Sequence, residues 1–172
     1  MHSYAISSKA DVSELISKYN PDFILYRDKE SPNYHVEALK FVQLCLEVKN
    51  LKYFLHQDVD LAKKLGATGV HLTSSQFEKI EYAKSLNLEV IISTHSLEEV
   101  QIAQEKGADY VTYSPIFASP NKGEPKGIEN LKTLLQKTDM NIFALGGIVE
   151  QKEVDLIKKS DVYGFASIRY FI

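Results

Sequence analysis

Polar side chains follow several short apolar runs of this chain, and their types suit proton transfer on an anionic ligand. His95 follows the run EVIIST (89–94), and a histidine can take and return a proton near neutral pH. Arg27 and Lys29 lie two positions apart after FILY, so an extended segment places both on one side, where they can bind an anion. The alternatives are that His95 only caps the following helix and that the two cations belong to a solvated loop.

Two further segments favour a bound phosphate. LGGI (145–148) contains paired glycines, which let backbone N–H groups approach a phosphate closely, and FASI (165–168) offers the N–H and hydroxyl of a serine. The long segment 114–131 has a lysine that can reach a phosphate if the loop closes over the ligand. Plain turns and a surface loop are the alternatives. The predicted phosphate ligands are Gly146, Gly147, Ala166, Ser167 and Lys122, beside Arg27 and Lys29.

His71 is expected on the inner side of its strand. Because Val70 and Leu72 flank it, its side chain points away from both of theirs, as an interior histidine satisfied by its neighbours would. No histidine or cysteine spacing resembles a zinc site, and no serine is framed as a hydrolase nucleophile. The remaining candidate pocket residues near strand ends are His56, Gln57, Thr73 and Thr94.

The elements that would position these residues alternate between strand and helix. Apolar residues at helical spacing predict helices over 36–48, 59–67, 97–108 and 127–137, with Gly66 and Gly107 ending two of them. The pattern predicts a (β/α)8 barrel, with an open doubly wound sheet as the alternative. Residues 1–172 are expected to form one domain whose last helix is missing or a single turn. The eight predicted strands are 3–7, 23–27, 52–57, 69–73, 89–94, 110–114, 141–147 and 163–168.

Composition narrows the class of protein. The chain has 172 residues, 44% of them hydrophobic, which suits one domain with a sizeable core. A net charge of −3 with mixed signs predicts no nucleic-acid partner, and no apolar run is long enough for a membrane helix. The start of the chain lacks the pattern of a secretion signal, and the single cysteine, Cys45, is expected to be buried. We therefore expect a cytoplasmic protein.

These segments, taken in order, resemble the thiamine phosphate synthase/TenI family. The resemblance runs nearly end to end, and the order of its motifs is specific. It implies a (β/α)8 barrel that handles phosphorylated thiazole intermediates of vitamin B1 synthesis. The matching segments are YAIS (4–7), YRDK (26–29), VDLAKKLGATGVHL (59–72), STHSLEEVQIAQEKGADYV (93–111), SPIFASPNK (114–122), LGGI (145–148) and GFASI (164–168).

The departures from the family pattern concern the metal. Synthases of the family have Asn-Asp where this chain has His56-Gln57, and an acidic residue where this chain has Gln76. Those carboxylates are similar in role to magnesium ligands that hold a pyrophosphate, and a neutral amide replaces such a ligand poorly. A glutamine of the family before the Arg27 motif is Leu25 here, and Ser119, a further candidate pocket residue, and Asn121 stand where two threonines are usual.

The resemblance therefore implies the TenI branch, a thiazole tautomerase that needs no metal or other cofactor. Its acid/base histidine falls on His95. The small-molecule partner would be a phosphorylated thiazole or thiamine phosphate, and a homodimer is left open. Two alternatives remain: a thiamine phosphate synthase with divergent magnesium ligands, and a non-catalytic barrel that binds thiazole or thiamine phosphate.

Overall fold

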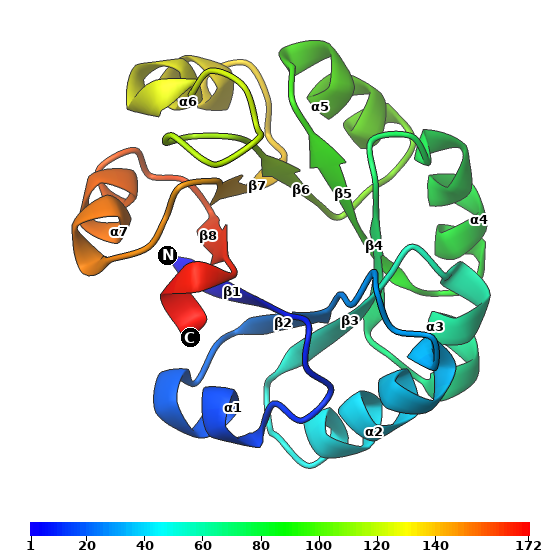
Figure 1. Cartoon of the computed structure of the whole chain (residues 1–172). Coiled ribbons are helices and arrows are strands. Elements are labelled where there is room, and N and C mark those ends of the chain that lie inside the picture. Colours follow the sequence, from blue (N-terminus) through cyan, green and yellow to red (C-terminus); the bar gives the residue numbers. More distant parts are fainter.

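The computed structural model describes residues 1–172 as a closed barrel of eight parallel strands in chain order (Figure 1). β1 pairs with β8, for example Ala5 with Ser167, and this pairing closes the sheet. The strands are β1 (His2–Ser7), β2 (Phe23–Tyr26), β3 (Lys52–His56), β4 (Gly69–Leu72), β5 (Glu89–Thr94), β6 (Tyr110–Tyr113), β7 (Asn141–Leu145) and β8 (Gly164–Ser167).

Helices form an outer ring around the strands (Figure 1). The final turn, η2, lies between α7 and α1, so a single turn follows β8, as the sequence predicted. None of the helices has the length and apolar character needed to cross a membrane. They are α1 (Ser13–Tyr19), α2 (Tyr34–Leu46), α3 (Val59–Leu65), α4 (Ile80–Ser85), α5 (Leu97–Glu105), α6 (Gly127–Leu135) and α7 (Gln151–Lys158), with short turns η1 (Phe77–Lys79) and η2 (Arg169–Phe171).

The prediction of a (β/α)8 barrel is confirmed, and the open-sheet alternative is wrong because closure leaves no strand edge. Local signals set the helix ends as expected. The side chain of Asp58 accepts the Leu61 N–H at the start of α3, and Gly66 ends that helix in the left-handed region at φ 73°. Gly107, in the left-handed region at φ 88°, lies one residue beyond Lys106, the C-cap of α5.

Alternation along each strand separates two apolar cores. Outward side chains pack under the helices, whereas inward side chains fill the barrel. At the amino end of the barrel, Lys52 pairs with Glu89 at 2.8 Å and donates to the Tyr110 hydroxyl, which closes that end with satisfied polar groups. The interior core consists of Tyr4, Ile6, Phe23, Leu25, Phe54, Ile91, Tyr110, Phe143 and Ala166.

Candidate functional site

A cavity of about 510 Å³ opens above the interior core at the carboxyl ends of the strands. Parallel strands bring groups from all parts of the chain to this face, where barrel enzymes bind their ligands. Most of the side chains predicted for the site meet here. The predicted residues that line the cavity are Arg27, Lys29, His56, His71, Thr73, His95, Ser119, Lys122, Gly146, Gly147 and Ser167.

The charged side chains that line the cavity are all positive. Arg27, Lys29, Lys122 and Arg169 line it, and no carboxylate does. None of the four cations forms an ion pair within the protein. Burial lowers the pKa of the half-buried Arg27, whose ordinary value is far above neutrality. The cavity therefore attracts a ligand that carries more than one negative charge.

The loop after β7 presents backbone donors to the cavity. Gly146 and Gly147 adopt left-handed conformations, at φ 102° and 70°, and their N–H groups donate to no other group of the protein. The N–H of Ile168, after β8, is free as well, and Ile168 also lines the cavity. Free N–H groups on residues that line one cavity are suitable donors to a phosphate.

Ser167 contributes differently from the prediction. Its hydroxyl donates to the Ile148 carbonyl at 2.7 Å and accepts the Tyr170 N–H at 3.2 Å. These bonds tie the loop after β7 to η2, so the hydroxyl proton is not available to a ligand. The expected hydroxyl contact to a phosphate is therefore corrected to a bond that holds the two loops together.

His95 lies at the cavity rim with about half of its side chain exposed. The cap of α5 comes from its neighbour, because the Ser96 hydroxyl accepts the Glu99 N–H at 3.2 Å. The Glu99 carboxylate accepts the backbone N–H of His95 at 2.6 Å and lies 3.4 Å from its Nδ1. The imidazole does not cap the helix, and its Nε2 has no partner within the protein, so this nitrogen is free to contact a ligand.

Two other histidines form the floor. His71 Nδ1 lies 2.7 Å from the Tyr4 hydroxyl and its Nε2 lies 3.0 Å from the Ser93 hydroxyl, which confirms an interior histidine satisfied by neighbours. Burial, then the charges of His56 and Arg27, lower the pKa of His71 to about 3. Burial, then Arg27 and Lys29, lower the pKa of His56 to about 4. Both rings are neutral at pH 7.

These shifts predict a loss of stability in mild acid. In the unfolded chain His56 and His71 titrate near 6.5, whereas in the folded chain they stay neutral down to about pH 4 and 3. As pH falls through this window the unfolded state binds more protons, so the free energy of unfolding decreases, by at most about 1.4 kcal/mol per pH unit for each histidine. Chemical denaturation between pH 7 and 4 measures the slope.

A variant separates the histidine contribution from that of other groups. His71→Gln should flatten the slope between pH 6.5 and 4. Equal slopes in wild type and His71→Gln would contradict a neutral, buried His71.

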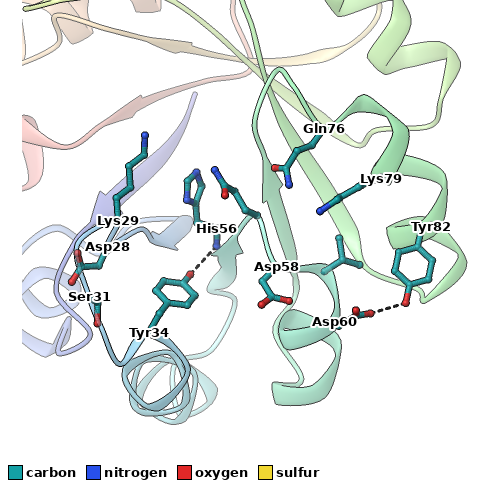
Figure 2. Close-up of a pocket in the computed structure, with 12 residues that line it drawn as sticks. Asp28, Lys29, Ser31, Tyr34, His56, Asp58, Asp60, Gln76, Lys79 and Tyr82 are labelled. Carbon is teal, nitrogen blue, oxygen red and sulfur yellow. Dashed lines mark hydrogen bonds between the residues drawn. The ribbon is translucent and has the colours of Figure 1, made fainter.

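Beside the main cavity lies a second, polar cleft that shares Lys29 and His56 with it (Figure 2). Gln57 and Gln76, which replace the family's expected magnesium ligands, both line this cleft. Three carboxylates line this cleft, and each already accepts a hydrogen bond; Asp28 accepts the Glu30 N–H at 3.0 Å. Asp58 caps α3, and Asp60 accepts the Tyr82 hydroxyl at 2.6 Å (Figure 2). These three carboxylates do not form a cluster that could hold a metal ion, and the two amides are poor ligands for Mg²⁺, so the cleft does not fit that ion.

Three predicted residues lie outside the main cavity. Thr94 is fully buried on the outer side of β5, where its hydroxyl donates to the Thr112 carbonyl at 2.9 Å. Gln57 turns into the second cleft at φ 67°, away from the inner side of β3. Ala166 is buried within the interior core and does not reach the cavity. A shift of one residue along a strand reverses the side that a side chain faces.

Three residues that build the cavity were not predicted from the sequence. Tyr4 and Ser93 complete the floor through His71, and Arg169 adds the fourth cation from η2. The inward alternation of β5 places Ser93 two residues before His95, and this spacing was the available signal. Nothing local in the sequence ties Tyr4 to His71, 67 positions away.

The segment 114–131 reaches the cavity with Ser119 and Lys122. The two ends of the segment are joined to each other, because the N–H groups of Lys126 and Gly127 donate to the Pro115 and Ile116 carbonyls at 2.8 and 3.0 Å. The Ile116 N–H donates to the Leu145 carbonyl of β7 at 2.9 Å, which ties this end of the segment to the barrel. Lys122 is exposed on this loop, and no carboxylate pairs with it. Its ammonium group can therefore approach an anion in the cavity.

Known proteins match this chain over nearly its whole length. The sequence profile of the family described as "Thiamine monophosphate synthase" matches residues 4–171. The "Putative thiamine-phosphate synthase 2" of Aquifex aeolicus is 32% identical over 169 residues, covering 92% of this chain and 87% of that protein. The "Thiamine-phosphate synthase" of Lactococcus lactis is 27% identical over 163 residues, covering 90% and 76%.

A solved structure has the same barrel. The thiamine phosphate pyrophosphorylase of Pyrococcus furiosus superposes with a TM-score of 0.84 at 27% identity, covering 97% of this chain and 85% of that protein. The family resemblance read from the sequence motifs is therefore confirmed by both sequence and fold.

Proposed function

Because the chain belongs to the thiamine monophosphate synthase family, we propose that it acts as a metal-independent isomerase on a thiazole phosphate carboxylate. One observation carries this choice: the main cavity is lined by four unpaired cations, no carboxylate and a histidine, His95, whose Nε2 has no partner within the protein. Such a cavity can hold a phosphate and a carboxylate of the same ligand directly, without a bridging dication.

The proposed reaction moves one proton. The free N–H groups of Gly146, Gly147 and Ile168 hold the phosphate, and Arg27 and Lys29 hold the carboxylate. His95 removes a proton from a ring carbon of the non-aromatic thiazole and returns it at another position of the same ligand, which leaves the aromatic isomer. No atom is gained or lost, and the histidine ends in its starting state.

The names of the relatives favour a second candidate, thiamine phosphate synthase. That reaction joins a pyrimidine pyrophosphate to a thiazole phosphate and is a transferase reaction. Gln57 and Gln76 provide no charge for the magnesium ion that would hold the pyrophosphate. A barrel that binds a phosphorylated thiazole or thiamine phosphate without catalysis is the third candidate, and it uses the same cationic cavity.

The amides predict that magnesium contributes little to diphosphate binding. Adding Mg²⁺ should change the affinity for inorganic pyrophosphate by less than about threefold, because neutral amides attract a hard dication weakly. Isothermal titration calorimetry with magnesium and with a chelator measures the difference.

Gln57→Asp is the matched variant, since aspartate tolerates the left-handed conformation at φ 67° better than most residues. It should make binding more dependent on magnesium. Strong magnesium dependence in the unmodified protein would favour the synthase.

We place this activity in the cytoplasm as part of the proposal. The only cysteine, Cys45, is buried on α2, and burial raises the pKa of its thiol to about 12, so it stays protonated and unreactive. The proposed small-molecule partner accounts for the cationic cavity, and no nucleic acid or membrane is invoked.

A further inference from the structure

A chain of hydrogen bonds runs from the barrel interior to the cavity floor. It starts at the fully buried Tyr4, passes through both nitrogens of His71 and ends at Ser93, which lines the cavity. The two contacts measure 2.7 and 3.0 Å. The inward neighbours of this chain, such as Phe54 and Ile91, are apolar, so packing alone would not need three polar groups here.

The position of the protons decides which group donates and which accepts in each of these hydrogen bonds. A neutral His71 carries one N–H, on either Nδ1 or Nε2. Tyr4 keeps its proton, because burial raises the pKa of its hydroxyl, and that hydroxyl has no partner except His71 Nδ1. If Nδ1 carried the hydrogen, the Tyr4 proton would be buried without an acceptor, which is costly.

The favoured arrangement therefore has Tyr4 donating to Nδ1 and Nε2–H donating to the Ser93 oxygen. The Ser93 proton then has no acceptor within the protein. Thr112, beside Ser93 in the strand register, has no hydrogen-bond partner for its own buried hydroxyl and so takes no proton from Ser93. The remaining direction for the Ser93 O–H is the cavity.

We propose that Tyr4 and His71 are positioning residues that hold the Ser93 hydroxyl as a hydrogen-bond donor to the ligand. The floor then selects a ligand group that only accepts a hydrogen bond, and disfavours one that must donate. This inference rests on the proposed function for the identity of the ligand. In a thiazole phosphate carboxylate, the accepting group is the ring nitrogen or the carboxylate.

The first test reads the tautomer in the ligand-free protein. Nitrogen-15 NMR of the imidazole rings distinguishes Nδ1–H from Nε2–H, and the His71 signals are identified by their loss in His71→Gln. A single Nε2–H tautomer that becomes mixed in Tyr4→Phe supports the proposal. A wild-type Nδ1–H tautomer would overturn it, whatever the protein binds.

The second test measures coupling between Tyr4 and Ser93. Calorimetry with the aromatic thiazole phosphate carboxylate should show that Tyr4→Phe weakens binding by about tenfold when Ser93 is present, and has little effect in Ser93→Ala. Tyr163→Phe, which removes a hydroxyl at the amino end of β8 from a ring packed on the same aromatic core, is the control and should leave affinity unchanged. Melting temperatures verify that each variant is folded.

The outcomes separate this inference from the proposed function. Equal effects of Tyr4→Phe with and without Ser93 would overturn the positioning role even if the isomerase activity is present. If wild-type protein binds no thiazole phosphate carboxylate but shows the Nε2–H tautomer, the proposed function and this choice of ligand fail. The orientation of Ser93 would in that case still be supported.

Discussion

His95→Gln should lower the rate of thiazole isomerisation by about 10²- to 10⁴-fold, the usual contribution of a general acid–base residue. Glutamine retains the size and polarity of the side chain but does not exchange protons near neutral pH. Affinity for the ligand should change little, because the proposed phosphate donors belong to the loops after β7 and β8. Steady-state kinetics and calorimetry on the same preparation measure both quantities.

The melting temperature provides the structural control for this variant. Because Ser96, and not the His95 ring, caps α5, His95→Gln should not lose the roughly 0.5–2 kcal/mol that removal of a cap costs. His2→Gln, at the amino end of the barrel, should retain the full rate. A large stability loss with an unchanged rate in His95→Gln would assign the histidine a structural role.

Gly147→Ala should damage both stability and anion binding. At φ 70° an alanine is strained by about 1–2 kcal/mol, and its Cβ would lie 2.6 Å from the Ala118 carbonyl oxygen and from Phe117 Cβ. Overpacking of this kind typically costs a further 1–3 kcal/mol or so, giving a total of about 2–5 kcal/mol. Displacement of the loop would also move the free N–H groups, so affinity for inorganic phosphate should fall more than tenfold. Denaturant unfolding and calorimetry measure the two effects.

Gly66→Ala is the matched control for this prediction. Gly66 has nearly the same φ, 73°, but no atom lies within 4 Å of a Cβ built there. Gly66→Ala should lose only the free energy of unfolding due to the strained backbone conformation, about 1–2 kcal/mol, and should bind phosphate normally. Equal losses of stability in both variants would show that the close packing of Gly147 against Phe117 and Ala118 is unimportant.

The fold could be predicted because each strand has a local signal. Short β-branched or aromatic runs end in turn residues, and Gly66 and Gly107 mark helix ends by their left-handed conformations. Strand ends were less certain. The run predicted over 141–147 ends at Leu145, because Gly146 and Gly147 leave the strand to form the loop.

The candidate site could be predicted only in part. Strand order brought Arg27, His71 and His95 to one cavity, since parallel strands share a carboxyl end. Some residues predicted for the cavity lie outside it because their side chains face the other side of the strand. Thr94, one residue before His95, faces the outer side of β5. Long-range partners such as Tyr4 and His71 depend on the closed barrel and have no local signature.

Isomerase and synthase activity can be measured side by side on the purified wild-type protein. Proton NMR monitors the non-aromatic thiazole phosphate carboxylate in the presence of a chelator, and a parallel sample contains pyrimidine pyrophosphate, thiazole phosphate and magnesium. We expect conversion to the aromatic isomer with the chelator present, and no thiamine phosphate in the parallel sample. Magnesium-dependent formation of thiamine phosphate, without isomerisation, would contradict this expectation.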